Sequence, residues 1–394
     1  MREVLILTHE YPPYIFGGVS SYMKEMVKFL SLKGFKVHVV TGRSDRKSLR
    51  VESLKNITFY RIYFPEVPIR SIWYSYFSKE VVLKIIEKVD VIIANALDTF
   101  FLYRILNCYK QGQLKKKIIT LHHGSLESII KYYKNVTLKD QIENLNLYEL
   151  LYYSMLPIYR ILLQKDLSQS TRLITVARHV VDELASEFPD MSHEIISKSS
   201  VIYGGIDFNT LSKFRTKFRN SCNKNVIIYG YVGRLFLLKG VKYAVEAFEL
   251  IQRHFSKNSE MWIFGEGPLK KWINRYAKTK ELNIKTFGHL PQVKLYTLIS
   301  KYVDVMIFPS LYEGCPYTIL EANAFGVPVV TWDLSWSREF IINGTNGFRV
   351  KHSSIDDLAT YSIKALDLKN KEAVVFNSAK FDKNKTFTGL VELF

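Results

Sequence analysis

The sequence predicts an α/β protein built from two doubly wound, Rossmann-like domains. Its 394 residues suit two domains of roughly 100–200 residues each. Apolar strand-like runs alternate with helix-like runs from end to end, which favours βαβ units and parallel sheets. A polar, basic stretch over residues 208–224 has the composition of a linker. We therefore expect one domain over residues 1–207 and a second over residues 225–378.

Each expected strand is a short run of apolar and β-branched residues, followed by a helical or Gly-rich segment. In the first domain the expected strands are Val4–Leu7, Lys36–Val40, Val89–Ala94, Lys117–Leu121, Arg172–Val176 and Ser200–Ile202. In the second domain they are Val226–Val232, Met261–Phe264, Ile284–Phe287, Val303–Phe308 and Pro328–Thr331. The crevice between two such domains is where we expect substrates.

The composition excludes disordered and membrane-spanning classes. Hydrophobic residues make up 47% and charged residues 23%, as in ordinary globular proteins. The longest apolar stretch, Leu147–Leu163, is interrupted by charges and a proline. The first residues resemble a strand that leads into a polar loop rather than a signal peptide. Three cysteines, far apart and odd in number, support neither a disulfide framework nor a zinc cluster. We expect a cytoplasmic protein.

The net charge of +18 calls for an anionic partner, which could be nucleic acid, acidic lipid or a phosphorylated substrate. The basic residues are dispersed, and no nucleic-acid-binding module accompanies them. We therefore expect no nucleic-acid partner and favour attraction to an anionic membrane surface, at its inner face.

A segment rich in Tyr and Leu, residues 129–163, is expected to be helical and amphipathic. It fits a buried helical pair in which the tyrosine hydroxyls find partners. It also fits a surface that contacts an acceptor or a membrane.

The most informative motif follows the expected strand Val303–Phe308. Its members are Glu313, Gly314, Cys315, Pro316, Tyr317 and Glu321. Glu313 would lie at the carboxyl end of a strand, where open α/β sheets bind ligands. We expect Pro316 as the first residue of a helix, whose amino-terminal end suits an anion while the carboxylates suit hydroxyls. Together these groups describe a site for a nucleotide-linked sugar.

Two further turns of the second domain carry polar groups. Arg234 and Lys239 lie in the loop after the strand Val226–Val232, so both could reach one diphosphate. Glu266 lies in a Gly-Glu-Gly-Pro turn after another strand. Taken alone, these groups also fit solvated loop cations and a structural turn.

Two motifs of the first domain could meet the same ligand. Gly17 and Gly18 precede a helix and would let a ligand approach the backbone, although an ordinary loop with Ser20 or Ser21 as the helix cap is the alternative. His122 and His123 end an expected strand. No other His or Cys joins them at ligand spacing, so we expect no metal site and favour hydrogen bonding to a sugar or an acceptor over a purely structural pair.

In this order, the motifs resemble the retaining glycosyltransferase family 4, which has the GT-B fold of two Rossmann-like domains facing each other across a cleft. The motifs that carry the resemblance are Gly17-Gly18-Val19, His122-His123-Gly124, Gly205-Ile206-Asp207, Gly233-Arg234 with Lys239-Gly240, Gly265-Glu266-Gly267-Pro268 and Glu313 to Glu321. The similarity covers nearly the whole chain. It implies that residues 379–394 cross back to the first domain.

The resemblance also implies roles for single residues. Arg234 and Lys239 would bind the donor diphosphate, Glu321 the ribose hydroxyls and Glu313 the donor sugar. Gly314 to Tyr317 would contact sugar or phosphate through backbone amides, with the Gly17-Gly18 loop closing over the phosphate. One histidine, His122 before His123, would approach the donor sugar. Many relatives carry Phe-Gly where this chain has Cys315 and Pro316, a difference that bears on the donor pocket.

The implied function is transfer of a hexose from a nucleotide-sugar to a glycan, lipid-linked or small-molecule acceptor. The resemblance favours a UDP-sugar as the donor. The anomeric configuration would be retained by front-face displacement, without a metal or another cofactor. Two alternatives stay open at this point. One is a nucleotide-sugar epimerase of the same architecture, and the other is a non-catalytic basic protein that binds nucleic acid or anionic lipid.

Overall fold

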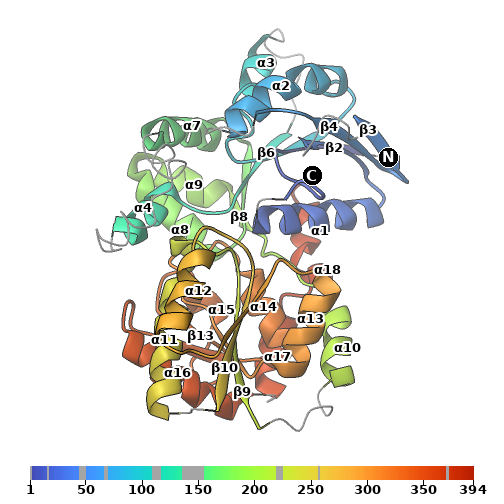
Figure 1. Ribbon diagram of the computed structural model, residues 1–394. Helices are drawn as coiled ribbons and strands as arrows, with labels where there is room; N and C mark the ends of the chain where they lie inside the picture. Colours follow the sequence, from blue (N-terminus) through green and yellow to red (C-terminus); the bar gives the residue numbers. More distant parts are fainter. Residues whose placement is uncertain are drawn as a thin grey trace. The chain divides into compact units, whose positions relative to one another are not determined.

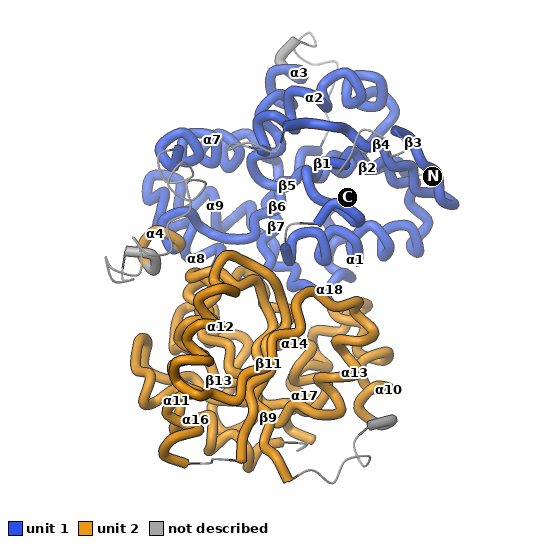
Figure 2. Tube along the Cα trace, in the orientation of Figure 1, with its two compact units in different colours: residues 1–128, 145–205, 386–394 blue, residues 129–144, 206–385 orange. Residues whose placement is uncertain are grey.

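The chain forms two compact units. A computed structural model describes residues 2–15, 17–43, 50–65, 70–108, 117–134, 155–218, 225–255, 258–369 and 372–394. Unit 1 comprises residues 1–128, 145–205 and 386–394, and unit 2 comprises residues 129–144 and 206–385 (Figure 2). The chain therefore passes from unit 1 to unit 2 between Gly205 and Ile206, two residues before the boundary expected from the sequence.

Unit 1 is built on an eight-stranded sheet (Figure 1). Its strands are β1 (Glu3–Thr8), β2 (Lys36–Gly42), β3 (Val51–Leu54), β4 (Ile57–Ile62), β5 (Val91–Asn95), β6 (Lys117–His122), β7 (Arg172–Thr175) and β8 (Ser199–Val201). The order across the sheet is β3-β4-β2-β1-β5-β6-β7-β8. All neighbours run parallel except β3, which pairs antiparallel with β4. The six strands expected in this half of the chain are confirmed.

The hairpin of β3 and β4 was not predicted. Every residue of β3 is exposed, and β4 alternates between buried and partly buried positions, so neither strand forms the continuous apolar run of a buried parallel strand. The turn between them places Lys55 at φ 55°, a conformation that residues other than glycine adopt infrequently.

Helices connect the strands of this sheet. They are α1 (Gly18–Leu32), α2 (Arg70–Ile85), α3 (Leu102–Cys108), α4 (Leu126–Lys134), α7 (Leu156–Gln169), α8 (Arg178–Glu187) and α9 (Ser192–Lys198). Within the ranges that the structure describes, every helix is too short or too polar to cross a membrane. Most of the Tyr-rich segment, residues 135–154, lies outside those ranges.

Unit 2 holds a parallel six-stranded sheet. Its strands are β9 (Ile227–Val232), β10 (Ser259–Phe264), β11 (Ile284–Gly288), β12 (Val305–Ile307), β13 (Val329–Trp332) and β14 (Gly347–Val350), in the order β11-β10-β9-β12-β13-β14. This is the doubly wound Rossmann order. Its five expected strands are confirmed, and β14 was not predicted. Both sheets confirm the expected fold class of two Rossmann-like domains.

Unit 2 also contains helices, and the first of these helices lies where a linker was expected. They are α10 (Phe208–Phe218), α11 (Val241–Leu250), α12 (Lys270–Thr279), α13 (Gln292–Tyr302), α14 (Tyr317–Ala324), α15 (Ser337–Phe340), α16 (Ile355–Lys364), α17 (Glu372–Ala379) and α18 (Lys383–Thr386). The prediction of a linker over residues 208–224 was wrong for α10. Leu211 of α10 is buried, and the Phe214 ring meets those of Tyr296 and Phe325 at 5.8 and 6.4 Å.

The last residues of the chain return to unit 1. Residues 386–394, with helix α19 (Thr388–Val391), belong to it. The fully buried ring of Phe387 lies 5.3 Å from that of Tyr22 and 5.8 Å from that of Phe29, both on α1. Phe394 meets Phe35 at 5.1 Å. Burial of such aromatic rings stabilises the return by a few kcal/mol, at about 25 cal/mol per Å² of apolar surface.

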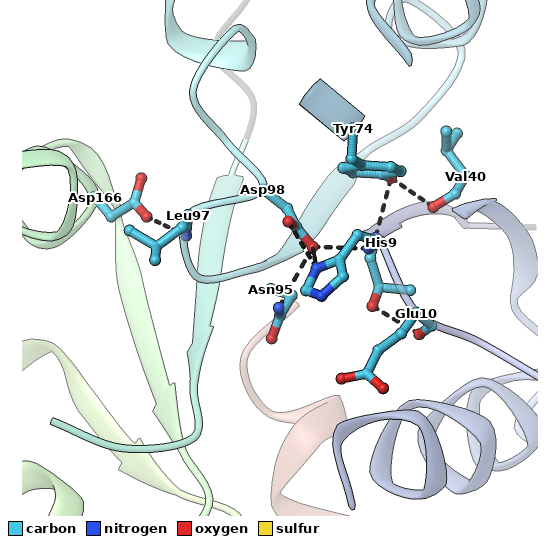
Figure 3. A network of polar contacts seen from close by, with 9 residues as sticks. His9, Glu10, Val40, Tyr74, Asn95, Leu97, Asp98 and Asp166 are labelled. Carbon is cyan, nitrogen blue, oxygen red and sulfur yellow. Dashed lines mark hydrogen bonds and ion pairs between the residues drawn. The ribbon is translucent and has the colours of Figure 1, made fainter. Parts of the chain in front are cut away.

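A buried carboxyl group holds the turn after β5. The backbone N–H of Leu97 donates to Asp166 of α7 at 2.7 Å (Figure 3), and the hydroxyl of Thr99 donates to its other oxygen. These bonds compensate for the φ of 71° at Leu97, which costs energy for a residue with a side chain. Burial raises the pKa of Asp166 to about 7, although both hydrogen bonds act to lower it.

We predict that Asp166→Asn removes a pH-dependent loss of stability. Because the folded pKa of about 7 exceeds the ordinary value of 3.8, the wild-type free energy of unfolding should fall as pH rises between these values. Asparagine keeps a carbonyl acceptor but cannot ionise. From about pH 5 to about pH 7.5 the wild type should lose roughly 2 kcal/mol more than the variant in chemical unfolding.

The exposed Asp190→Asn is the matched control, and it should follow the wild type. Parallel curves for the wild type and Asp166→Asn would show that Asp166 is already ionised in the folded protein.

Candidate functional site

The strand order of unit 2 brings two distant loops together. Strand β9 lies between β10 and β12, and the chain leaves β9 towards β10 but reaches β12 only after two further βα units. At such a reversal of strand order, the loops at the carboxyl ends of the two strands diverge and leave a place for a ligand. The loops here are residues 233–240 after β9 and residues 308–316 after β12.

Backbone hydrogen bonds connect the loop 233–240 to its neighbours. Gly233 N–H donates to the Phe264 carbonyl at 3.0 Å, and Leu235 N–H donates to the Glu266 carbonyl at 2.9 Å. Both acceptors lie at the end of β10 or in the turn after it. The loop is therefore fixed by its backbone, which leaves its side chains available for binding.

Glycine is required where this loop meets the one after β12. Leu311 N–H donates to the Leu238 carbonyl at 2.9 Å. Gly240 has φ 73°, and a Cβ there would lie 1.9 Å from the Pro309 carbonyl oxygen. Any side chain at Gly240 would push the two loops apart.

An ion pair joins the two loops. Nζ of Lys239 lies 2.6 Å from Oε1 of Glu313 and 3.4 Å from the Tyr312 carbonyl oxygen. The Ser310 hydroxyl donates to the same Oε1 at 2.7 Å. The side chains are 19% and 13% exposed, so salt screens this pair less than an ion pair on the surface. The sequence placed Lys239 and Glu313 on one ligand, but it did not predict that they contact each other.

Arg234 stands apart from this pair. Its side chain is exposed, with the guanidinium 5.1 Å from the centre of the Phe236 ring. Among the residues that the structure describes, no carboxylate forms an ion pair with Arg234. The buried Tyr231 hydroxyl lies within hydrogen-bond distance of the carbonyls of Arg234 and Lys239, at 3.1 and 3.0 Å. The tyrosine fixes the backbone of both residues, and the unpaired guanidinium gives the loop a net positive charge.

Glu321 lies on α14, with a different partner. The hydroxyl of Tyr296 on α13 donates to its Oε1, and Gln292 donates to the same hydroxyl at 2.6 Å. Burial raises the pKa of Glu321 to about 7, against the lowering effect of the Tyr296 hydrogen bond. Glu313 and Glu321 therefore lie on successive segments, one paired with a cation and the other with a phenol.

The residues between these carboxylates form the entry to α14. Pro316 has ψ 91° and is the residue that precedes the helix, which begins at Tyr317. The expectation of Pro316 as the first helical residue was therefore wrong by one position, because its ψ is extended. Gly314 and Cys315 are partly buried, and Cys315 is not in a disulfide. The positive end of the α14 dipole lies at this entry.

Glu266 occupies the neighbouring turn after β10. Its exposed carboxylate pairs with Lys270 at 2.7 Å. The preceding Gly265 has φ 139°, and a Cβ there would lie 1.9 Å from the Gly233 carbonyl oxygen. Glu266 thus borders the loop that carries Arg234, in agreement with its predicted place.

In unit 1, the glycine pair begins α1. Gly17 precedes the helix and Gly18 is its first residue, so the alternative of Ser20 or Ser21 as the cap was wrong. Gly17 N–H donates to Glu10 at 3.0 Å. A Cβ at Gly17 would meet no atom within 4 Å, which leaves open space beside this backbone.

The two histidines end β6. His122 is buried, with Nε2 at 2.9 Å from the Thr120 hydroxyl, and its Nδ1 has no hydrogen-bond partner in the part of the chain that the structure describes. Burial lowers its pKa to about 4. His123 is partly buried, and its ring meets that of Tyr22 at 5.4 Å. Burial, with the nearby His122 and His9, lowers the pKa of His123 to about 3. Both side chains are neutral at physiological pH.

A third histidine was missed by the sequence analysis. In unit 1 the strand order reverses between β1 and β5, and His9 and Asp98 follow these strands. His9 Nδ1 lies 3.0 Å from both carboxylate oxygens of Asp98 (Figure 3). Although burial acts to lower it, Asp98 raises the pKa of His9. His9 lies two residues after the first predicted strand, Val4–Leu7, and this position was the signal available in the sequence.

The structure thus brings Arg234, Lys239, Glu266 and Glu313 into one set of connected loops in unit 2, with Glu321 on the helix that follows. Gly17, Gly18, His122 and His123 lie at loop and strand ends of unit 1. Among the described residues, no cluster of three or more His, Cys, Asp or Glu side chains is placed to hold a metal ion.

Two family models match consecutive parts of the chain. Glycosyltransferase Family 4 matches residues 16–210, and Glycosyl transferases group 1 matches residues 212–386. An uncharacterised glycosyltransferase of Methanocaldococcus jannaschii is 25% identical over 96% of this chain and 93% of its own length. A Mycobacterium tuberculosis glycogen synthase is 31% identical, over 50% of this chain and 46% of its own length.

Solved structures share the fold at lower identity. The sucrose-phosphate synthase of Thermosynechococcus elongatus superposes with a TM-score of 0.78 at 16% identity, covering 100% of this chain and 98% of that one. Anabaena HepE, in complex with UDP and glucose, gives a TM-score of 0.69 at 16% identity, covering 100% and 99%. These likenesses show the fold, and the two family matches together with the glycosyltransferase relative decide against a non-catalytic binding protein. The chain belongs to the GT-B glycosyltransferases of the group 1 and family 4 type.

Proposed function

We propose that the enzyme transfers a sugar from a nucleotide diphosphate sugar, bound at the strand-order reversal of unit 2, with retention of the anomeric configuration. The observation that carries the proposal is the charge arrangement there. Lys239 is neutralised by Glu313 at 2.6 Å, whereas Arg234, in the same loop as Lys239, is exposed without an ion-pair partner among the described residues. The surplus positive charge, beside the positive end of α14, suits a diphosphate.

The side chains of Glu313, Lys239 and Arg234 suit the end of the donor where the bond between sugar and phosphate breaks. Glu313 would accept hydrogen bonds from the sugar hydroxyls, and Lys239 and Arg234 would stabilise the charge that develops on the leaving diphosphate. The bond from the sugar to the phosphate oxygen breaks as the bond to the acceptor oxygen forms on the same face. The acceptor proton passes to the leaving phosphate oxygen. The two cations supply the charge that a metal supplies in other enzymes, so we propose that no metal is needed.

A uridine diphosphate donor is the first candidate. HepE binds UDP and glucose. A relative from Escherichia coli is a UDP-Gal galactosyltransferase that acts on a diphosphoundecaprenol acceptor. It is 28% identical over 49% of this chain and 50% of its own length. For this chain we propose a glycan or lipid-linked acceptor, met in the cytoplasm or at the inner face of a membrane. The roles of Gly17, Gly18, His122, His123 and Glu266 stay predictions.

Turnover tests the function. With UDP-, GDP- and ADP-sugars, we expect one nucleotide to be released faster when glycan or lipid-linked acceptors are added, and EDTA to leave the rate unchanged. The product linkage should keep the donor's anomeric configuration in NMR spectra. Conversion of the donor in the absence of any acceptor would instead indicate an epimerase.

Arg234→Ala should weaken nucleotide diphosphate binding roughly 10- to 100-fold in calorimetry, since a charge-assisted hydrogen bond contributes about 1.5–3 kcal/mol. Lys239→Ala should weaken it as well, and should also lower stability because Glu313 loses its partner. The matched control is Lys285→Ala, which breaks an ion pair with Glu260 at 2.7 Å in the same unit. Equal losses of nucleotide affinity in all three variants would contradict a diphosphate site formed by Arg234 and Lys239.

Glu321 should make nucleotide binding depend on pH. Its pKa is about 7, and only the ionised carboxylate can accept hydrogen bonds from both ribose hydroxyls. Affinity for UDP should therefore rise with pH up to about 7, by as much as ~10-fold per unit below it. Glu321→Gln should bind more weakly and lose this component of the profile. A variant profile parallel to that of the wild type would rule out ribose binding by Glu321.

A further inference from the structure

Helix α2 carries large apolar residues on its outer side as well as on its buried side. On its inner side, against the rest of unit 1, the helix buries Ser71, Tyr74, Ser75, Ser78, Val82 and Ile85. Its opposite face carries Trp73, Tyr76, Phe77 and Leu83, which are 40%, 42%, 43% and 42% exposed. A surface helix ordinarily buries its apolar stripe and exposes its small polar residues. Helix α2 does bury Tyr74, Val82 and Ile85 in the core, but three buried serines opposite three exposed aromatic rings depart from that pattern.

The buried serines have a role in holding the helix. Ser75 accepts a hydrogen bond from Phe101 N–H at 2.8 Å, and Ser78 donates to the Ser75 carbonyl at 3.2 Å. The Tyr74 hydroxyl donates to the Val40 carbonyl of β2 at 2.6 Å. Polar contacts on the inner side of α2, together with its buried Tyr74, Val82 and Ile85, therefore fix its orientation, and the outer rings stay about two-fifths exposed.

These rings continue onto the turn before α3. The Tyr76 ring lies 5.3 Å from that of Phe77 and 5.3 Å from that of Phe101, and Phe100 meets Phe101 at 4.9 Å. Trp73 lies 6.4 Å from Phe77. We call these five residues, Trp73, Tyr76, Phe77, Phe100 and Phe101, the aromatic face; the three on α2 are exposed and Phe100 and Phe101 are partly buried beside them. Exposed apolar residues gathered in one patch mark interaction surfaces.

Cations accompany the aromatic face. Nζ of Lys79 lies 4.3 Å from the centre of the Tyr76 ring, and the Arg104 guanidinium lies 5.2 Å from that of Phe100. Lys84 is exposed on the outer side of α2. The exposed acid on the helix is Glu80, and Glu87 lies just past its end. They are fewer than the nearby cations Lys79, Lys84 and Arg104, and the chain as a whole carries +18.

We propose that the aromatic face is a membrane-docking surface that inserts into the headgroup region of an anionic lipid bilayer. Trp and Tyr rings with Lys and Arg beside them suit the boundary between headgroups and acyl chains. The positive charge complements acidic lipid. A second copy of the chain fits less well, because a two-fold contact would set Lys79 and Arg104 against the same cations of the partner.

This surface goes beyond the proposed function, since it concerns where the enzyme works rather than the donor site. Its consequence for the acceptor rests on the proposed function: an enzyme held on a bilayer would meet lipid-linked acceptors there. Lipid binding can be measured without turnover, so failure of the docking surface and failure of the donor site are separable.

Vesicle sedimentation tests the proposal. The wild type should bind vesicles of phosphatidylcholine with phosphatidylglycerol and bind phosphatidylcholine alone much more weakly. The double variant W73S/F77S should lose roughly tenfold or more in partitioning to the anionic vesicles. Lys79→Glu and Arg104→Glu should weaken binding to anionic vesicles and make the remaining binding depend less steeply on salt. Phe376→Ser, at a residue that is 81% exposed on α17 of unit 2, is the control and should bind like the wild type.

Folding of W73S/F77S is checked by an unchanged melting temperature. If that variant unfolds, Trp73→Phe serves instead, because brominated phospholipids should quench a fluorescence component that disappears with Trp73. The proposal is overturned if the wild type ignores anionic vesicles, if W73S/F77S binds them as tightly as Phe376→Ser does, or if the aromatic face proves to hold a dimer that W73S/F77S dissociates.

Discussion

The reversal of strand order in each sheet is the constraint on which the rest of the structure depends. In unit 2, β9 and β12 are neighbours, although two βα units separate them in the chain. In unit 1 the same relation holds for β1 and β5. Loops that leave neighbouring strands in opposite directions open a place for a ligand. The polar groups discussed above collect at these two points: Arg234, Lys239 and Glu313 at one, His9 and Asp98 at the other.

The backbone does most of the positioning in the donor site. Loops 233–240 and 308–316 are joined by main-chain hydrogen bonds and by a contact at Gly240 that admits no side chain. The ion pair of Lys239 with Glu313 spans this fixed frame. Because the two joined loops already hold the charged side chains in place, the protein needs little rearrangement when negative charge develops on a leaving group. Arg234, exposed and unpaired among the described residues, is the group still able to take a new partner.

The sequence predicted what depends on local pattern. Buried parallel strands are continuous apolar runs, so eleven strands and the fold class could be expected. The exposed β3, the half-buried β4 and the short β14 carry no such run. Helix α10 was mistaken for a linker, because its buried face consists of few residues, Leu211 and Phe214 among them. The bond between Lys239 and Glu313, the pairing of His9 with Asp98 and the outward aromatic rings of α2 depend on tertiary contacts that no spacing encodes.

A crystal structure of the protein with UDP would test the central claim, that the donor binds at the strand-order reversal of unit 2, most directly. We expect the diphosphate against Arg234, Lys239 and the beginning of α14, with the ribose hydroxyls on Glu321 and the Tyr296 hydroxyl displaced or shared. Nucleotide bound elsewhere in the molecule, with Lys239 and Glu313 still paired and Arg234 untouched, would contradict the account.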